Sequence, residues 1–176
     1  MRTLLVVSAI VALSACVKRE PLPPLTGGSP TDSVAPLSLE LPKYPDGQKV
    51  DLAKDRGNVV LLDVWATWCE PCRDALPTYE ALQQEYGKKG LKIYALNVDE
   101  DQSLIPQFLQ ETKVTLPILL DRNGQTAEKL LKVKLMPTAF LIDKRGVIRH
   151  VHEGFAEEFL QQYQTEIETL LAEKRE

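Results

Sequence analysis

Two cysteines three residues apart are the side chains best placed to do chemistry in this chain. Cys69 and Cys72 enclose Glu70-Pro71 and closely follow the apolar run 59–65, which predicts a buried strand. A helix is expected to begin at about Pro71. Sulfurs at i and i+3 on a first helical turn can close a disulfide without large backbone movement. The positive end of the helix dipole would stabilise a thiolate on Cys69, so the pattern predicts a redox-active dithiol.

Two other uses of the cysteine pair remain open. A structural disulfide at this spacing closes so small a loop that it would constrain the unfolded chain little. A zinc site needs about four ligands, and His150 and His152 are the only histidines. These histidines alternate on a predicted strand and share one face, and we interpret them as ordinary surface residues, with weak metal binding as the alternative. The sequence thus predicts neither a metal nor an organic cofactor.

The N-terminal part of the chain differs in composition from the rest. Residues 1–15 combine Arg2 with an apolar run shorter than the roughly 20 residues that span a bilayer, the pattern of an export signal. Leu13-Ser14-Ala15-Cys16 resembles the bacterial lipobox, which implies a lipid on Cys16 and an anchor in the cell envelope. Proline-rich residues 16–36 are interpreted as a tether, and residues 37–176 as the folded domain.

The domain alternates short strands with helices, which predicts an α/β fold. The net charge of −4 argues against a nucleic-acid partner. The expected strands are 39–41 and 50–52 as a hairpin, then 59–65, 91–98, 116–120, 138–142 and 147–151; the expected helices are 71–86, 99–112, 125–132 and 156–174.

Residues 37–176 resemble the thioredoxin superfamily, in its extracytoplasmic TlpA-like and ResA-like branch. The match rests on residues 64–73, on Pro77, on residues 136–143 and on Gly146. The resemblance implies a thioredoxin-like three-layer α/β/α sandwich with an N-terminal hairpin and an inserted helix–strand segment at 99–121. It also implies that Cys69 attacks the substrate and that Cys72 resolves the mixed disulfide.

The same resemblance assigns roles to residues around the dithiol. Pro137 matches a cis-proline that faces the cysteines, and the Met136 backbone would pair with an extended substrate strand. From its place next to Cys69, independent of the resemblance, Trp68 is expected to form an apolar docking platform, whereas Trp65 is expected in the core. Gly154 would keep the active surface uncrowded.

One acidic residue and one difference from the family's usual sequence complete the expected site. Asp63 matches the buried aspartate of thioredoxins, where desolvation would raise its pKa and allow it to accept a proton from Cys72. Ala75 stands where many cytochrome-maturation reductases carry glutamate, so assignment to cytochrome c maturation is weakened.

The expected function is protein thiol–disulfide exchange outside the cytoplasm. The partners would be a protein thiol or disulfide substrate and a membrane electron donor or acceptor that regenerates the dithiol; we expect a monomer. Glu70-Pro71 resembles the reductases of the superfamily, with cytochrome c maturation as one candidate role. A disulfide oxidase or isomerase, a copper-binding chaperone and a purely structural lipoprotein are the alternatives. A peroxiredoxin would need a Thr-x-x-Cys motif, which Thr67-Trp68-Cys69 does not match.

Overall fold

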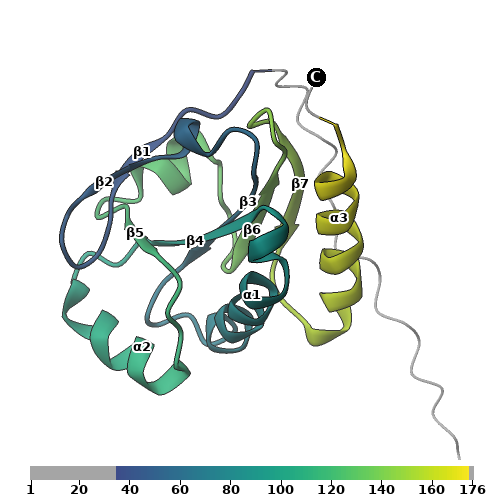
Figure 1. Ribbon diagram of the computed structural model, residues 1–176. Helices are drawn as coiled ribbons and strands as arrows, with labels where there is room; N and C mark the ends of the chain where they lie inside the picture. The colour runs from purple at the N-terminus through teal and green to yellow at the C-terminus, as the bar shows by residue number, and fades with distance from the viewer. Residues whose placement is uncertain (1–34, 175–176) are drawn as a thin grey trace, which may run out of the picture.

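A five-stranded mixed sheet forms the centre of the computed structural model, which describes residues 35–174 (Figure 1). Its strand order is β5-β4-β3-β6-β7, with β3, β4 and β5 parallel and β6 antiparallel to both its neighbours. The strands of the sheet are β3 (Val59–Trp65), β4 (Leu91–Asn97), β5 (Ile118–Leu120), β6 (Thr138–Ile142) and β7 (Ile148–Glu153).

A separate hairpin of β1 (Glu40–Pro42) and β2 (Lys49–Asp51) precedes the sheet. The Tyr44 N–H donates to the Ile118 carbonyl at 2.9 Å, and Lys43 bridges Leu119. The hairpin therefore covers part of the β5 edge, which would otherwise offer unpaired backbone groups.

Three α-helices lie on one face of the sheet: α1 (Cys72–Tyr86), α2 (Ile105–Thr112) and α3 (Leu160–Ala172) (Figure 1). The shorter helices are η1 (Leu52–Asp55), η2 (Gly87–Lys89), η3 (Gln102–Leu104), the π-helix η4 (Gln125–Leu130) and η5 (Glu157–Phe159).

Alternation along β3 explains the layers. All seven β3 residues are buried; Leu61 and Trp65 join the core under the α-helices, whereas Leu62 and Val64 join a second core. That second core contains Leu41 of the hairpin and Ala127 of η4. The expected thioredoxin-like layered α/β fold is confirmed, with an antiparallel hairpin at its start and with α2 and β5 forming the inserted segment.

Several element boundaries differ from the expectation. The helix expected at 99–112 begins only at Ile105, because Asp101 accepts the Ser103 N–H and caps the short η3. The helix expected at 125–132 is the π-helix η4, which follows Gly124 in the left-handed region at φ 61°. The C-terminal helix starts at Leu160, after the turn η5.

The residues interpreted as the signal 1–15, lipidated Cys16 and most of the tether 16–36 lie outside the described residues. Among the residues that are described, no helix is long and apolar enough to cross a membrane.

Candidate active site

The cysteine pair lies where β3 leads into α1. Cys72 is the first residue of the helix, and Cys69 precedes it in the connecting loop. The two sulfurs form a disulfide of 1.99 Å with the Cα atoms 5.4 Å apart. Cys69 is 5% exposed and Cys72 is fully buried. Cys69 is therefore the sulfur that a substrate can reach first.

The start of α1 surrounds the pair with backbone bonds. The Cys72 N–H donates to the Cys69 carbonyl at 3.2 Å, and the Arg73 N–H donates to the Glu70 carbonyl at 3.0 Å. Since these donors are occupied, the helix favours a Cys69 thiolate through its dipole rather than through free N–H groups. Arg73 also pairs with Glu111 of α2 at 2.8 Å and lies 3.7 Å from Glu70, so it offsets the negative charge between the cysteines.

Asp63 projects from β3 to the face that carries both cysteines. Its side chain is fully buried, and neither carboxylate oxygen has a hydrogen-bond partner. Burial raises the pKa of Asp63 well above its ordinary value because water no longer stabilises the charged form. A carboxyl in this environment keeps its proton to a higher pH than a solvent-exposed aspartate does.

The loop before β6 contains a cis peptide bond between Met136 and Pro137. Met136 packs against the core cluster that includes both cysteines, and within residues 35–174 its backbone N–H and carbonyl form no hydrogen bond. The Gly154 N–H donates to the Pro137 carbonyl at 2.7 Å, which places the end of β7 beside this proline. A Cβ on Gly154 would meet only Leu135 at 3.7 Å, so its φ of +84° rather than crowding explains the glycine.

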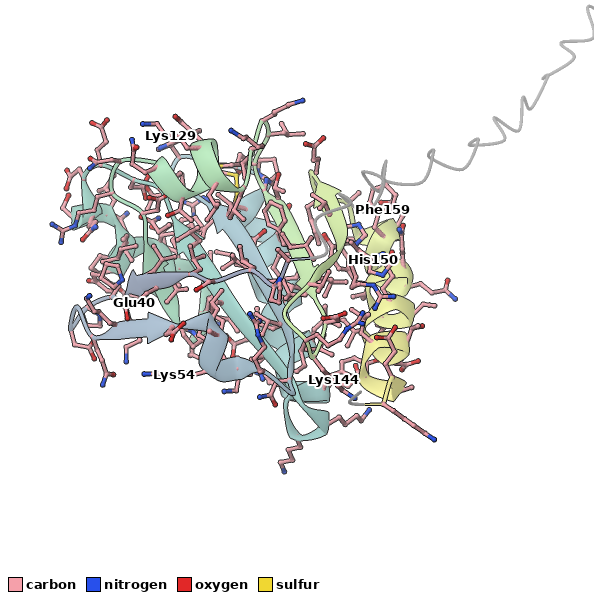
Figure 2. The ribbon with its side chains drawn as sticks, turned by 90° about the horizontal axis from the view of Figure 1, so that it is seen from above. Glu40, Lys54, Lys129, Lys144, His150 and Phe159 are labelled. Carbon is pink, nitrogen blue, oxygen red and sulfur yellow. A yellow bond between two sulfur atoms is a disulfide. The ribbon has the colours of Figure 1, made fainter. Side chains whose placement is uncertain are left out.

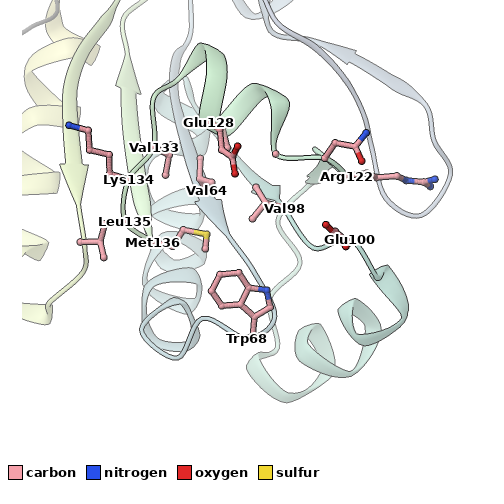
Figure 3. A pocket seen from close by; sticks show the side chains of 13 residues that line it. Val64, Trp68, Val98, Glu100, Arg122, Glu128, Val133, Lys134, Leu135 and Met136 are labelled. Carbon is pink, nitrogen blue, oxygen red and sulfur yellow. The ribbon is translucent and has the colours of Figure 1, made fainter.

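Trp68 is the most exposed large apolar side chain of the described residues, at 70%, whereas Trp65 is fully buried as expected. Trp68 and Met136 form part of the wall of a cavity of about 320 Å³ (Figure 3). Apolar and charged side chains share its lining: Val64, Val98, Ala127, Val133, Leu135, Glu100, Arg122, Glu128 and Lys134.

Asp99 is a site residue that the sequence reasoning missed. It is buried, and its carboxylate accepts the Thr67 N–H at 2.9 and 3.3 Å and the Asn97 Nδ2 at 2.8 Å. It therefore fixes the loop that carries Trp68 and Cys69. The sequence signal was the polar pair Asn97 and Asp99 around the end of the apolar strand β4, at the sheet end where β3 also stops.

The interpretation of both histidines as surface residues is wrong for His152. His152 is fully buried, because α3 packs over its face of β7, and its Nε2 lies 2.6 Å from the Glu166 Oε2. His150 is partly exposed and lies beside α3, with its Nδ1 3.5 Å from Glu166 (Figure 2). Throughout residues 35–174, no group of three or more His, Cys, Asp and Glu side chains could hold a metal ion.

A disulfide at the start of a helix, a cis-proline loop at the same sheet end and a mixed sheet flanked by helices define a thioredoxin-fold protein. The model of the redoxin family matches residues 22–169, and the chain belongs to this family. The resemblance to the TlpA-like and ResA-like branch of the thioredoxin superfamily is thereby confirmed.

Curated relatives and solved structures agree with this placement. The chain is 38% identical to the thioredoxin-like protein YneN of Bacillus subtilis over 64% of its own length and 66% of the relative. It is 36% identical to the thiol-disulfide oxidoreductase ResA of Oceanobacillus iheyensis over 62% of its length and 56% of the relative. The chain thus spans less than two thirds of either relative.

The fold comparison gives a broader match. A solved structure from Chlorobium tepidum, provisionally assigned as a thiol:disulfide interchange protein DsbE, has a TM-score of 0.73 at 33% identity, covering 84% of this chain and 99% of that one. A provisionally assigned protein disulfide isomerase from Bacteroides thetaiotaomicron has a TM-score of 0.70 at 26% identity. That match covers 78% of this chain and 88% of that one.

Proposed function

We propose that the protein is a protein thiol–disulfide oxidoreductase that reduces disulfides of exported proteins. The observation that carries this proposal is the Cys69–Cys72 disulfide, with one sulfur at the surface and the other buried, on the face that also holds Asp63. Relatives named thiol-disulfide oxidoreductase support the same chemistry.

The reaction is a pair of thiol–disulfide exchanges. The reduced Cys69 thiolate attacks one sulfur of the substrate disulfide, forming a mixed disulfide and releasing the other substrate sulfur as a thiolate. The Cys72 thiol then gives its proton to the Asp63 carboxylate and attacks the Cys69 sulfur. The internal disulfide forms, the second substrate sulfur leaves as a thiolate, and both electrons of the dithiol have passed to the substrate.

The proposed docking surface for the substrate consists of Trp68, Met136, Pro137 and Gly154. The free N–H and carbonyl of Met136 can pair with an extended substrate backbone, as an added strand does. The exposed indole of Trp68 offers apolar contact area next to Cys69.

The proposed location is the cell envelope, outside the cytoplasm, with a lipid on Cys16 as the anchor. A membrane electron donor would return the Cys69–Cys72 pair to the dithiol form, and the domain would act as a monomer. Cytochrome c maturation is one candidate role, although position 75 carries a fully buried alanine and so supplies no carboxylate there.

The reduction potential of the Cys69–Cys72 pair tests the direction of electron flow. We expect equilibration with dithiothreitol buffers to give a value nearer to about −270 mV than to about −120 mV, the values of thioredoxin and of a strong oxidant. A value near the oxidant would overturn the reductase proposal.

Trapping tests the order of attack. In Cys72→Ser the mixed disulfide at Cys69 cannot be resolved, so a model disulfide substrate should remain attached and be released by reductant. The matched variant Cys69→Ser should trap none, because Cys72 is buried. Equal trapping by both variants would contradict the assigned roles.

A further inference from the structure

Asp63 lies in a cross-strand row with a second buried titratable group. Register pairs Asp63 with Ala95 on one side and Ala139 on the other, and Ala139 in turn pairs with His152. Paired residues project to the same face of a sheet, and strands lie about 4.8 Å apart. Asp63 and His152 are thus two strands apart, and the side chain between them in the row is the methyl group of Ala139.

This row contains an unusual share of unpaired buried polar atoms. Within the described residues five buried side-chain polar atoms have no hydrogen-bond partner, and three of them are the two Asp63 oxygens and the His152 Nδ1. Buried polar atoms are nearly always bonded, so an accumulation at one place calls for an explanation.

Two tyrosines pack on the same face of the sheet as the row. Tyr79 of α1 and Tyr163 of α3 are fully buried, and their hydroxyls are 3.0 Å apart. Both are near enough to Asp63 for its negative charge to contribute to raising the pKa of each tyrosine, although burial is the main cause. Two hydroxyls carry two hydrogens, and the bond between them uses one. One hydrogen is left over, and the Asp63 carboxyl on the same face of the sheet has no donor.

Two residues along β3 from Asp63 and on the same face, the Trp65 Nε1 is a buried donor that has no partner within residues 35–174. The residues that flank Asp63 on β4 and β6 are alanines, and α1 presents Cys72 in addition to Tyr79. On the β7 side the hydrogen-bonded pair His152–Glu166 packs beside Tyr163, whose ring lies 4.5 Å from the imidazole. That contact fixes where the Tyr163 hydroxyl can lie.

We propose that the Tyr79–Tyr163 hydroxyl pair donates a hydrogen bond to the Asp63 carboxylate once Asp63 has lost its proton, and that His152 with Glu166 positions this pair. The inference rests on the proposed role of Asp63 as the proton acceptor for Cys72. In functional terms the pair sets the pH at which Asp63 becomes a base, so Tyr79 and Tyr163 are positioning residues that act through Asp63.

The test compares tyrosine variants of the full chain. Tyr79→Phe/Tyr163→Phe removes both hydroxyls and retains both rings. The Asp63 titration is followed by carboxyl carbon NMR in the oxidised protein, where no catalysis is needed. We expect the midpoint to rise by about one pH unit, a tenfold gain in proton affinity. Each single variant should give a smaller rise, because one hydroxyl remains to donate.

Tyr86→Phe is the matched control. Tyr86 also lies on α1, is 1% exposed and bonds to Glu168 of α3 at 2.8 Å, and the acids that raise its pKa are Glu168 and Glu85 rather than Asp63. Its loss should leave the Asp63 midpoint unchanged. An unchanged midpoint in the double variant, or an equal rise in Tyr86→Phe, overturns the inference.

A second measurement separates this inference from the proposed function. The rate at which Cys72 resolves a mixed disulfide is measured against pH. In the double variant the inflection should move up with the NMR midpoint, giving a rate about tenfold lower below the inflection and equal to wild type well above it. If Asp63→Asn leaves this rate profile unchanged while the tyrosine variants still move the NMR midpoint, the proposed role of Asp63 as proton acceptor fails and the hydroxyl contact stands.

Discussion

Asp63 is the residue at which stability and chemistry oppose each other. A carboxyl without hydrogen-bond partners in the core is stable only while it is neutral, because a buried charge without a partner is costly. Its folded-state pKa is raised above the unfolded value, so the folded chain holds a proton that the unfolded chain releases. Wild-type stability therefore falls as pH rises above about 4, the ordinary aspartate value.

Asp63→Asn should remove this dependence. The variant keeps the shape of the neutral acid but cannot ionise, so its melting temperature relative to wild type should increase from about pH 4 upward until Asp63 ionises in the folded protein. Thermal unfolding of the oxidised proteins at several pH values measures the difference.

Asp101→Asn is a control for which the pH dependence of stability relative to wild type should have the opposite sign. Asp101 is exposed, and bonds from the Ser103 N–H and hydroxyl lower its pKa. Its contribution to stability is present above the unfolded pKa and is lost as pH falls, so this variant should become less stable relative to wild type as pH rises. A pH-independent difference for Asp63→Asn would contradict the buried, raised-pKa description.

At the scale of elements, the site depends on how the end of β3 is tied to the end of β4. The loop that carries Trp68 and Cys69 is fixed by one buried carboxylate, that of Asp99 on the adjacent connection. Without it the Thr67 N–H would be left without its acceptor in a part-buried place.

Asp99→Ala should therefore destabilise the domain by about 1–3 kcal/mol and slow attack by Cys69. Denaturant unfolding gives the first quantity and the rate with a model disulfide the second. Asp46→Ala is the matched control, since Asp46 also accepts a backbone N–H, that of Gln48 at 3.0 Å, but is exposed in the hairpin turn. Equal losses for the two variants would show that Asp99 does not anchor the loop.

Elements defined by local pattern could be predicted from the sequence. The bounds of β3 are as expected, and α1 ends at Tyr86 as expected and begins at Cys72, one residue after the expected start. The start of α2 and the π-helix η4 could not be predicted, because they depend on contacts such as the Asp121 carboxylate accepting the Ala127 N–H at 2.8 Å.

The same distinction between local sequence pattern and contacts between distant residues applies to the site. The cysteine motif and the apolar run around Asp63 lie in adjacent sequence, and the cis-proline was recognised through a family motif. Tyr79, Tyr163 and His152 come together only through the cross-strand row and the packing of α3. His152 looked exposed because the alternation around Val151 does not reveal which face α3 covers.

At the scale of the whole molecule, β3 separates two tasks. Asp63 projects to the face under α1 and α3, while its neighbour Val64 forms part of the cavity beside Trp68 (Figure 3). The cavity beside Trp68 and the proposed proton acceptor thus lie on opposite faces of one strand, and variants that alter the cavity need not disturb Asp63.

The proposed anchor is tested on the intact chain in cells. Cys16→Ser should move the protein from the membrane fraction to the soluble fraction, because the acyl chains would be lost. Its exchange rate with a soluble disulfide substrate should stay at the wild-type value. A protein that remains in the membrane fraction would contradict lipid anchoring at this residue.

The contrast between the two tryptophans gives the protein two optical reporters. Trp65 is completely enclosed, whereas Trp68 is 70% exposed directly before the reactive cysteine. The fluorescence of Trp65 responds to the integrity of the core. The fluorescence of Trp68 responds to a molecule that covers the dithiol. Unfolding and substrate capture can therefore be followed as separate spectral events in one unlabelled sample.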